Sequence, residues 1–245
     1  IEEQTHYPFD EKIHFVVSAE HPATFPLYLR IPEWCKTPSV AINGRRVKQT
    51  LSPGKFLRIE REWKNKDSVE LKLPMTISVR DWSANHDSVS VNYGPLTFSL
   101  DISEHWKKLD SSKTAIGDSH WQKNADPSKW PSFEIDPASS WNYGLVLNTK
   151  QPEKSFRVRH RRWPANNFPF TEESCPIELV AKAKLIPEWT MDRNGLCATL
   201  QQSPIASDQP TQTVKLVPMG AARLRISAFP VIGSGADAHQ WVAQK

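Results

Sequence analysis

The sequence has 245 residues, of which 38% are hydrophobic and 24% are charged, as expected for a globular protein with a core. This length allows one large β domain or two sandwiches of roughly 100–130 residues each. The net charge of +4 is a mild excess, and the sequence has no run of about 18 apolar residues, which excludes a membrane-spanning helix.

The first hundred residues alternate apolar and polar side chains, the pattern of strands with one buried face. Such runs occupy residues 13–17, 40–42, 57–60, 69–73, 89–93 and 96–100. Asn43-Gly44 predicts a tight hairpin turn before Val47. Many short strands, together with 20 prolines that oppose long helices, predict an all-β fold of antiparallel β-sandwiches.

Residues 103–143 differ from the rest because they are polar and contain Trp106, Trp121, Trp130 and Trp141 without a clear strand pattern. A connection of this length is unusual inside a compact domain. We therefore predict a domain boundary near residue 101, followed by a long tryptophan-containing loop.

Further strands are predicted after this loop, and the sequence then ends in a tail without a pattern. The strands are expected at residues 144–147, 155–160, 177–186, 197–200, 213–219 and 223–229. Residues 233–245 are rich in small and polar side chains, so we predict a loose tail.

We find no catalytic or metal-binding pattern in the sequence. Cys35, Cys175 and Cys197 form no CxxC pair, so they are expected to be free and buried, with a Cys175–Cys197 disulfide as the less favoured alternative. The pairs Glu172-Glu173 and Glu60/Glu62 are the nearest to two carboxylates that could flank a glycosidic bond, and both are interpreted as solvated. We assign no catalytic residue and no metal ligand.

The only dense basic run, residues 157–163, alternates with apolar residues and is interpreted as the solvent face of a strand. A nucleic acid is not an expected partner, because a nucleic-acid-binding protein needs a wider basic face. A membrane is not an expected partner either, because the sequence has no long apolar run. The polar start at residues 1–6 is neither a signal peptide nor a natural start, so we expect a piece of a longer protein.

A set of motifs, taken in order, resembles the region after the catalytic barrel in glycoside hydrolase family 127, the β-L-arabinofuranosidases. The motifs lie at residues 25–34, 40–44, 56–63, 67–75, 93–101 and 216–230. The chain departs from the family in turns: Glu33 and Lys66 stand where the family usually or often has glycine, and Met219 stands where an aromatic residue is common.

The resemblance implies two antiparallel β-sandwiches, with the second inserted before the last strands of the first. Residues 1–100 and 213–232 would form the first sandwich, and residues 101–212 the second. The implied partner is an N-terminal (α/α)6 barrel of the same parent chain, which would hold the family's catalytic cysteine, glutamate and zinc, so that no cofactor is expected here. The resemblance also implies a possible homodimer, a glycan substrate of the parent, and a periplasmic or extracellular bacterial location, with the cytoplasm as an alternative.

The sequence therefore predicts a non-catalytic accessory region of a glycan-degrading enzyme. One alternative is an autonomous carbohydrate-binding module, with Trp121 and Trp130 as the candidate sugar-binding residues because sugar rings stack on exposed aromatic faces. Another is a complete small enzyme, which would require a pocket with converging carboxylates.

Overall fold

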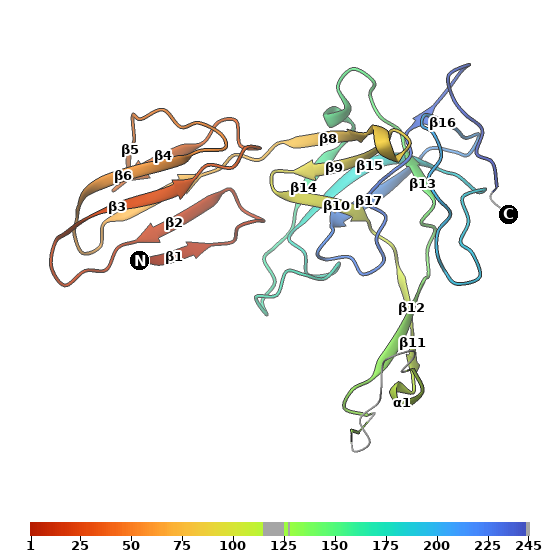
Figure 1. The fold of residues 1–245 in the computed structure, drawn as a ribbon, viewed down its shortest axis with the longest axis horizontal. Helices are drawn as coiled ribbons and strands as arrows, with labels where there is room; N and C mark the ends of the chain where they lie inside the picture. The colour runs from red at the N-terminus through yellow and green to blue at the C-terminus, as the bar shows by residue number, and fades with distance from the viewer. Residues whose placement is uncertain (115–124, 127, 244–245) are drawn as a thin grey trace. The chain divides into compact units, whose positions relative to one another are not determined.

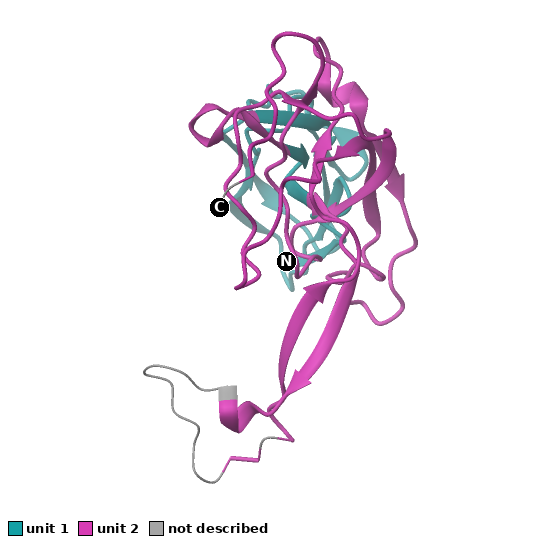
Figure 2. Cartoon of the chain, turned by 90° about the vertical axis from the view of Figure 1, so that its right-hand side faces the viewer, with its two compact units in different colours: residues 1–80, 91–98 teal, residues 81–90, 99–245 magenta. Residues whose placement is uncertain are grey.

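The computed structural model describes residues 1–114, 125–126 and 128–243, and the chain divides into two compact units. Unit 1 contains residues 1–80 and 91–98, and unit 2 contains residues 81–90 and 99–245 (Figure 2). The predicted all-β class is confirmed, because both units are built mainly from antiparallel strands (Figure 1). No helix within the described ranges is long and apolar enough to cross a membrane.

Unit 1 contains two antiparallel sheets. One sheet has the strand order β1-β2-β7-β4-β5, with bounds Glu2–Thr5, Lys12–Val16, Ser68–Lys72, Ser39–Ile42 and Arg45–Arg46. The other pairs β3 (Ala23–Arg30) with β6 (Phe56–Trp63) along their full length. Side chains alternate between core and solvent on β6 and β7, which is why the period-2 pattern located these strands, whereas β1 and β5 are exposed throughout and show no such alternation.

Trp63 is one of the buried residues of the core of unit 1. Its side chain is fully buried, its Nε1 donates a hydrogen bond to the carbonyl of Phe25 at 2.9 Å, and its ring stacks on Phe25 at 5.8 Å. The buried indole thus has a partner for its only polar atom, as a core tryptophan requires. Trp63 is therefore a packing residue of this core.

The predicted Asn43-Gly44 hairpin turn is also present, and the Asn43 side chain forms hydrogen bonds with residues at the start of β7. Asn43 and Gly44 have φ values of 50° and 75°, which a two-residue hairpin of this type requires. Asn43 Nδ2 donates to Asp67 Oδ1 at 2.7 Å, and Ser68 N donates to Asn43 Oδ1 at 2.8 Å. Hydrogen bonds therefore hold the β4–β5 turn against the start of β7.

Unit 2 is centred on a sheet whose strand order is β13-β15-β17-β10-β9-β8, with β14 also paired to β15. In this order the strands are Tyr143–Leu145, Ile177–Leu185, Gln212–Pro218, Leu96–Leu100, Ser88–Tyr93 and Ile77–Trp82, and β14 is Arg157–His160. Strands β8, β9 and β10 also contribute residues to unit 1. The sheet joins strands from both sides of residue 101, and the predicted division into two sandwiches stays a prediction.

The smaller elements of unit 2 include a parallel pair and short helices. Strands β16 (Ile205–Ala206) and β18 (Ile232–Gly233) pair in parallel. The helices within the described residues are the single turns η1 (Ser83–Asn85), α1 (Ser111–Thr114) and η2 (Pro152–Ser155).

The segment predicted as a long loop contains a β-hairpin instead. Strands β11 (Glu104–Leu109) and β12 (Ser132–Pro137) pair over six positions, with Trp106 opposite Ile135, and extend from the rest of unit 2 (Figures 1 and 2). Most side chains of the hairpin are exposed on both faces. A ladder of this kind produces no apolar alternation, which explains why the sequence pattern missed it.

Two other predicted strands are absent from the described fold. Residues 197–200 make only a single bridge between Met191 and Cys197, and residues 223–229 only a bridge between Phe229 and Val89. The Ile226 carbonyl accepts a hydrogen bond from Leu100 N at 2.9 Å. The second segment thus contacts the sheet at separated points, where Phe229 is buried and Leu224 and Ile226 are partly buried without a continuous ladder.

Within the loose tail predicted over residues 233–245, Trp241 packs into a tryptophan cluster, while most of the other described side chains are exposed. Trp241 is buried and lies 5.4 Å from the ring of Trp189, which in turn contacts Trp141 edge-on at 5.1 Å. Ile186 and Ile205 complete this core.

Candidate functional site

Of the two tryptophans predicted to bind sugar, Trp130 is among the described residues and Trp121 is not. Trp130, just before β12, is 69% exposed, and its carbonyl accepts a hydrogen bond from the Ser111 hydroxyl. Its exposure permits stacking on a sugar ring, and sugar binding by either residue stays a prediction.

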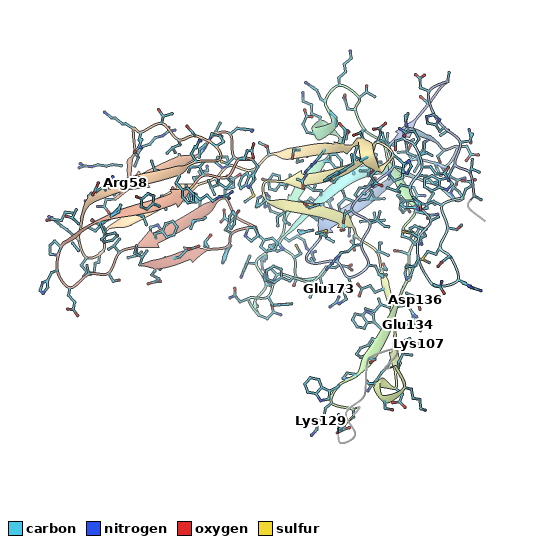
Figure 3. The ribbon with its side chains drawn as sticks, viewed as in Figure 1. Arg58, Lys107, Lys129, Glu134, Asp136 and Glu173 are labelled. Atoms are coloured by element: carbon cyan, nitrogen blue, oxygen red, sulfur yellow. The ribbon has the colours of Figure 1, made fainter. Side chains whose placement is uncertain are left out.

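A charged hollow of about 700 Å³ lies in unit 2, beside strands β14, β15 and β17. Its lining includes Asp101, Glu172 and Glu173 together with Arg159, Arg161 and Lys215. Glu173 is labelled at this position in Figure 3. The hollow therefore combines acidic and basic groups from segments that are far apart in the sequence.

Two arginines fix the wall of this hollow. Arg161 donates from Nη1 to the carbonyl of Glu172 at 3.0 Å and from Nη2 to the carbonyl of Glu173 at 2.8 Å. Arg159 pairs with the buried Glu178 at 3.2 Å. Because Arg161 follows β14, its guanidinium ties the 172–173 segment to that strand.

Glu172 has the most strongly perturbed carboxyl group of the hollow. Burial raises its pKa from 4.5 to about 7, and the nearby charges of Asp101, Glu104 and Glu173 act in the same direction, whereas Arg223 opposes them. Its Oε1 is buried without a hydrogen-bond partner in the described structure. Such a group can hold or release a proton near neutral pH.

Glu104, at the start of β11, has a side chain that is only 8% exposed. Its Oε2 accepts hydrogen bonds from Trp106 Nε1 at 2.9 Å and Arg223 Nη1 at 3.4 Å, and the Arg223 guanidinium lies 5.0 Å from the Trp106 ring centroid. Its Oε1 is buried and, within the described part of the chain, has no partner. Burial also raises the pKa of Asp101, an effect that Lys215 opposes.

Sequence reasoning missed this cluster, because it treated Glu172-Glu173 as a solvated pair. Glu173 is exposed, as predicted, but Glu172 is partly buried. Its surroundings come from residues 101, 104 and 223, and no local pattern at residue 172 signals those contacts.

A second, smaller pocket of about 290 Å³ lies at the base of the β11–β12 hairpin. It lies between β12, the 191–197 turn and residues 224–226, and Trp141 forms part of its wall. Figure 3 shows two of its lining residues, Glu134 and Asp136, on the hairpin. Lys107 pairs with Glu134 at 3.0 Å across the same ladder.

The three cysteines are free, and no Cys175–Cys197 disulfide is present. Cys35 and Cys175 are buried, and burial raises the pKa of both thiols, whereas Cys197 is exposed, contrary to the expectation for a free cysteine. Among the described residues, no group of three or more His, Cys, Asp and Glu side chains could hold a metal ion.

Comparison with known proteins gives one family match and several similar structures. Residues 1–75 match the family model described as "Beta-L-arabinofuranosidase, GH127 middle domain". No curated protein matches the sequence.

Similar solved structures include a GH127 β-L-arabinofuranosidase from Geobacillus stearothermophilus T6, with 21% identity and a TM-score of 0.52 over 92% of this chain and 28% of that one. The GH127 β-arabinofuranosidase BT3674 has 16% identity and a TM-score of 0.55 over 94% and 31% of the two chains. A third structure, described as a glycoside hydrolase, has 18% identity and a TM-score of 0.57 over 94% and 32%.

The chain thus spans about a third of the length of these solved proteins. At such identities the structural matches indicate a shared fold, and the match to a GH127 family model covers residues 1–75 alone. Residues 1–75 are thus similar to the middle domain of GH127 β-L-arabinofuranosidases, and the chain shares its fold with part of each of these solved glycoside hydrolases.

Proposed function

We propose that the chain is the accessory region that supports the catalytic barrel of a parent β-L-arabinofuranosidase-like enzyme. The observation that carries this proposal is the match of residues 1–75 to the GH127 middle domain. The partial coverage of the solved GH127 enzymes agrees with it. In this proposal the parent hydrolyses a glycan with L-arabinofuranosyl units, and the (α/α)6 barrel supplies the chemistry.

The outer face of the β3–β6 sheet in unit 1 offers a surface for such support. Tyr28 and Phe56 are exposed by 55% and 64%, and Arg58, labelled in Figure 3, lies beside them. Arg58 donates to Tyr28 Oη at 3.1 Å and pairs with Glu60 at 2.6 Å. Exposed aromatic rings held beside a fixed ion pair are typical of surfaces that another domain covers.

The zinc of the family belongs, in this proposal, to the barrel. The described residues offer no ligand set for a metal, so they do not fit that ion. We further propose the two-sandwich arrangement, with residues 101–212 inserted between 1–100 and 213–232, and a homodimer of an exported protein.

The test is release of L-arabinose from an aryl β-L-arabinofuranoside by the full-length parent and by the 245-residue chain. We expect activity only in the parent. Phe56→Ser in the parent should lower the melting temperature of the whole enzyme more than that of the isolated chain, because only the parent can cover this side chain. Activity in the isolated chain would refute the proposal.

A second candidate function is carbohydrate binding by the chain itself, favoured by the 69% exposure of Trp130. In this case Trp121→Ala and Trp130→Ala would each weaken binding to an arabinan. Unchanged affinity in the double variant would remove this candidate.

A further inference from the structure

The pocket at the base of the β11–β12 hairpin combines an aromatic wall with polar side chains of both charges. Its volume of about 290 Å³ is at the lower end of the range for ligand pockets, which suits a ligand of one ring. Three separate segments of unit 2 form it: β12, the 191–197 turn and residues 224–226.

Packing fixes the aromatic wall in place. Trp141 is half-buried and contacts Trp189 edge-on, with ring centroids 5.1 Å apart. Trp189 is itself buried, and its Nε1 donates to the Ala198 carbonyl at 2.9 Å. Since the Trp189 ring cannot rotate without losing this bond, the Trp141 ring lies against a rigid support.

The polar side of the pocket is also held in place. The Nε of Arg225 donates to the Ala222 carbonyl at 2.8 Å, which orients the guanidinium beside the pocket. Asn194 lies in a turn closed by Asp192, whose Oδ1 accepts hydrogen bonds from the backbone N–H groups of Asn194 and Leu196 at 2.8 and 2.9 Å. Asp136 projects from β12 on the same strand face as Glu134.

This combination selects for the chemistry of a sugar. A carboxylate accepts hydrogen bonds from hydroxyl groups, a guanidinium donates to them, and an amide does both. One ring face of a sugar is apolar and packs on an aromatic side chain. A ligand with a net charge would be repelled by the like charge of either Asp136 or Arg225, so the pocket favours a neutral polyhydroxylated ring.

We propose that this pocket binds a single neutral monosaccharide unit of a glycan, with Trp141 as the stacking surface and Asp136, Asn194 and Arg225 as hydrogen-bonding groups. The inference rests on the proposed function only for the choice of L-arabinose among the probes. The site differs from the one predicted at Trp130, because Trp130 is not among the described residues that line the pocket.

The exposed Cys197 lines the same pocket and provides a direct readout of its occupancy. Cys35 and Cys175 are buried, so iodoacetamide should alkylate Cys197 first in the folded chain. The experiment measures this rate by mass spectrometry with and without the methyl glycosides of L-arabinofuranose, D-galactose, D-glucose and D-xylose. We expect at least one of them to slow the alkylation tenfold or more at saturation.

The matched variants are Asp136→Asn and Arg225→Gln in the pocket and Trp130→Ala outside it. Each pocket variant should raise the sugar concentration needed for protection at least tenfold, since each removes a charge-assisted hydrogen bond. In Trp130→Ala the glycoside should protect Cys197 from alkylation as it does in the unchanged chain. In Cys197→Ser the early alkylation should be absent. Circular dichroism confirms that each variant is folded.

The proposal is overturned if none of the four glycosides protects Cys197 from alkylation. It is likewise overturned if Cys197 is protected at the same sugar concentration in both pocket variants as in the unchanged chain. It is also overturned if Trp130→Ala abolishes protection, which would place the sugar at the predicted tryptophan site. None of these results depends on arabinose release by the parent, so the failure of this inference and that of the proposed function are distinguishable.

Discussion

Replacing Glu172 with glutamine tests the physical account of the charged hollow. The substitution keeps the size of the side chain and removes its charge. In the folded chain the pKa of Glu172 is raised from 4.5 to about 7, by burial first and then by the charges of Asp101, Glu104 and Glu173 against Arg223. A carboxyl group with a raised pKa stabilises the fold while it is protonated, and this stabilisation is lost as pH rises from 4.5 through about 7.

The magnitude follows from the pKa. Each pKa unit between the folded and unfolded states corresponds to about 1.4 kcal/mol, so a rise from 4.5 to about 7 would give roughly 3 kcal/mol for a fully buried group. Glu172 is only partly buried, and solvent screens its charge. We therefore expect about 1 kcal/mol of pH-dependent destabilisation in the free energy of unfolding.

The assay is urea denaturation of the unchanged chain and of Glu172→Gln at pH values from about 4 to 8. At the acidic end, the free energy of unfolding of Glu172→Gln minus that of the unchanged chain gives the reference difference. By the alkaline end this difference should have shifted in favour of the variant by about 1 kcal/mol. The exposed Glu173→Gln serves as the control, because it removes a neighbouring charge and leaves the partly buried carboxyl group in place. A difference between Glu172→Gln and the unchanged chain that stays constant across this range would refute the reasoning.

Three further predictions concern unit 1 and are read out by thermal or urea unfolding. Lys66 has a φ of 67°, so Lys66→Gly should relieve left-handed strain and stabilise the chain by up to about 1 kcal/mol, whereas a loss of stability would contradict this strain. Trp63→Leu should cost about 3 kcal/mol, because it opens a cavity and leaves the Phe25 carbonyl without its donor; a cost below about 1 kcal/mol would show that the core refills. Gly94→Ala should cost about 2 kcal/mol or more, since its Cβ would lie 2.6 Å from Met75 Cγ at a φ of 55°, and an unchanged midpoint would mean that Met75 moves aside.

The sequence predicted unit 1 well because its signals are local. In β6, Leu57, Ile59 and Trp63 point to the core, and their spacing shows this directly. The Asn43-Gly44 turn needs two positive φ values, which few residues other than asparagine and glycine adopt. The position of Lys66 also explains why glycine is common there in the family: the backbone is left-handed at this residue.

The missed features of unit 2 depend on contacts between distant segments. The β11–β12 hairpin is held by a backbone ladder whose side chains are mostly exposed, and such a ladder produces no hydrophobic period. The raised pKa of Glu172 depends in part on charges about 50 to 70 positions away in the sequence, such as those of Glu104 and Asp101. The pocket beside Trp141 likewise forms only when three segments meet.

The position of Trp241 in the tryptophan cluster has a consequence for how the protein folds during synthesis. Trp241 packs on Trp189, and the backbone of His239 pairs with Ile205, so the core of unit 2 is completed by residues translated more than thirty positions after β16 begins. Unit 1 needs none of these late residues, because its last residue is Phe98. On the ribosome, unit 1 can therefore gain most of its contacts early, while unit 2 must wait with its apolar side chains uncovered until this last segment emerges, which is the stage at which chaperones act.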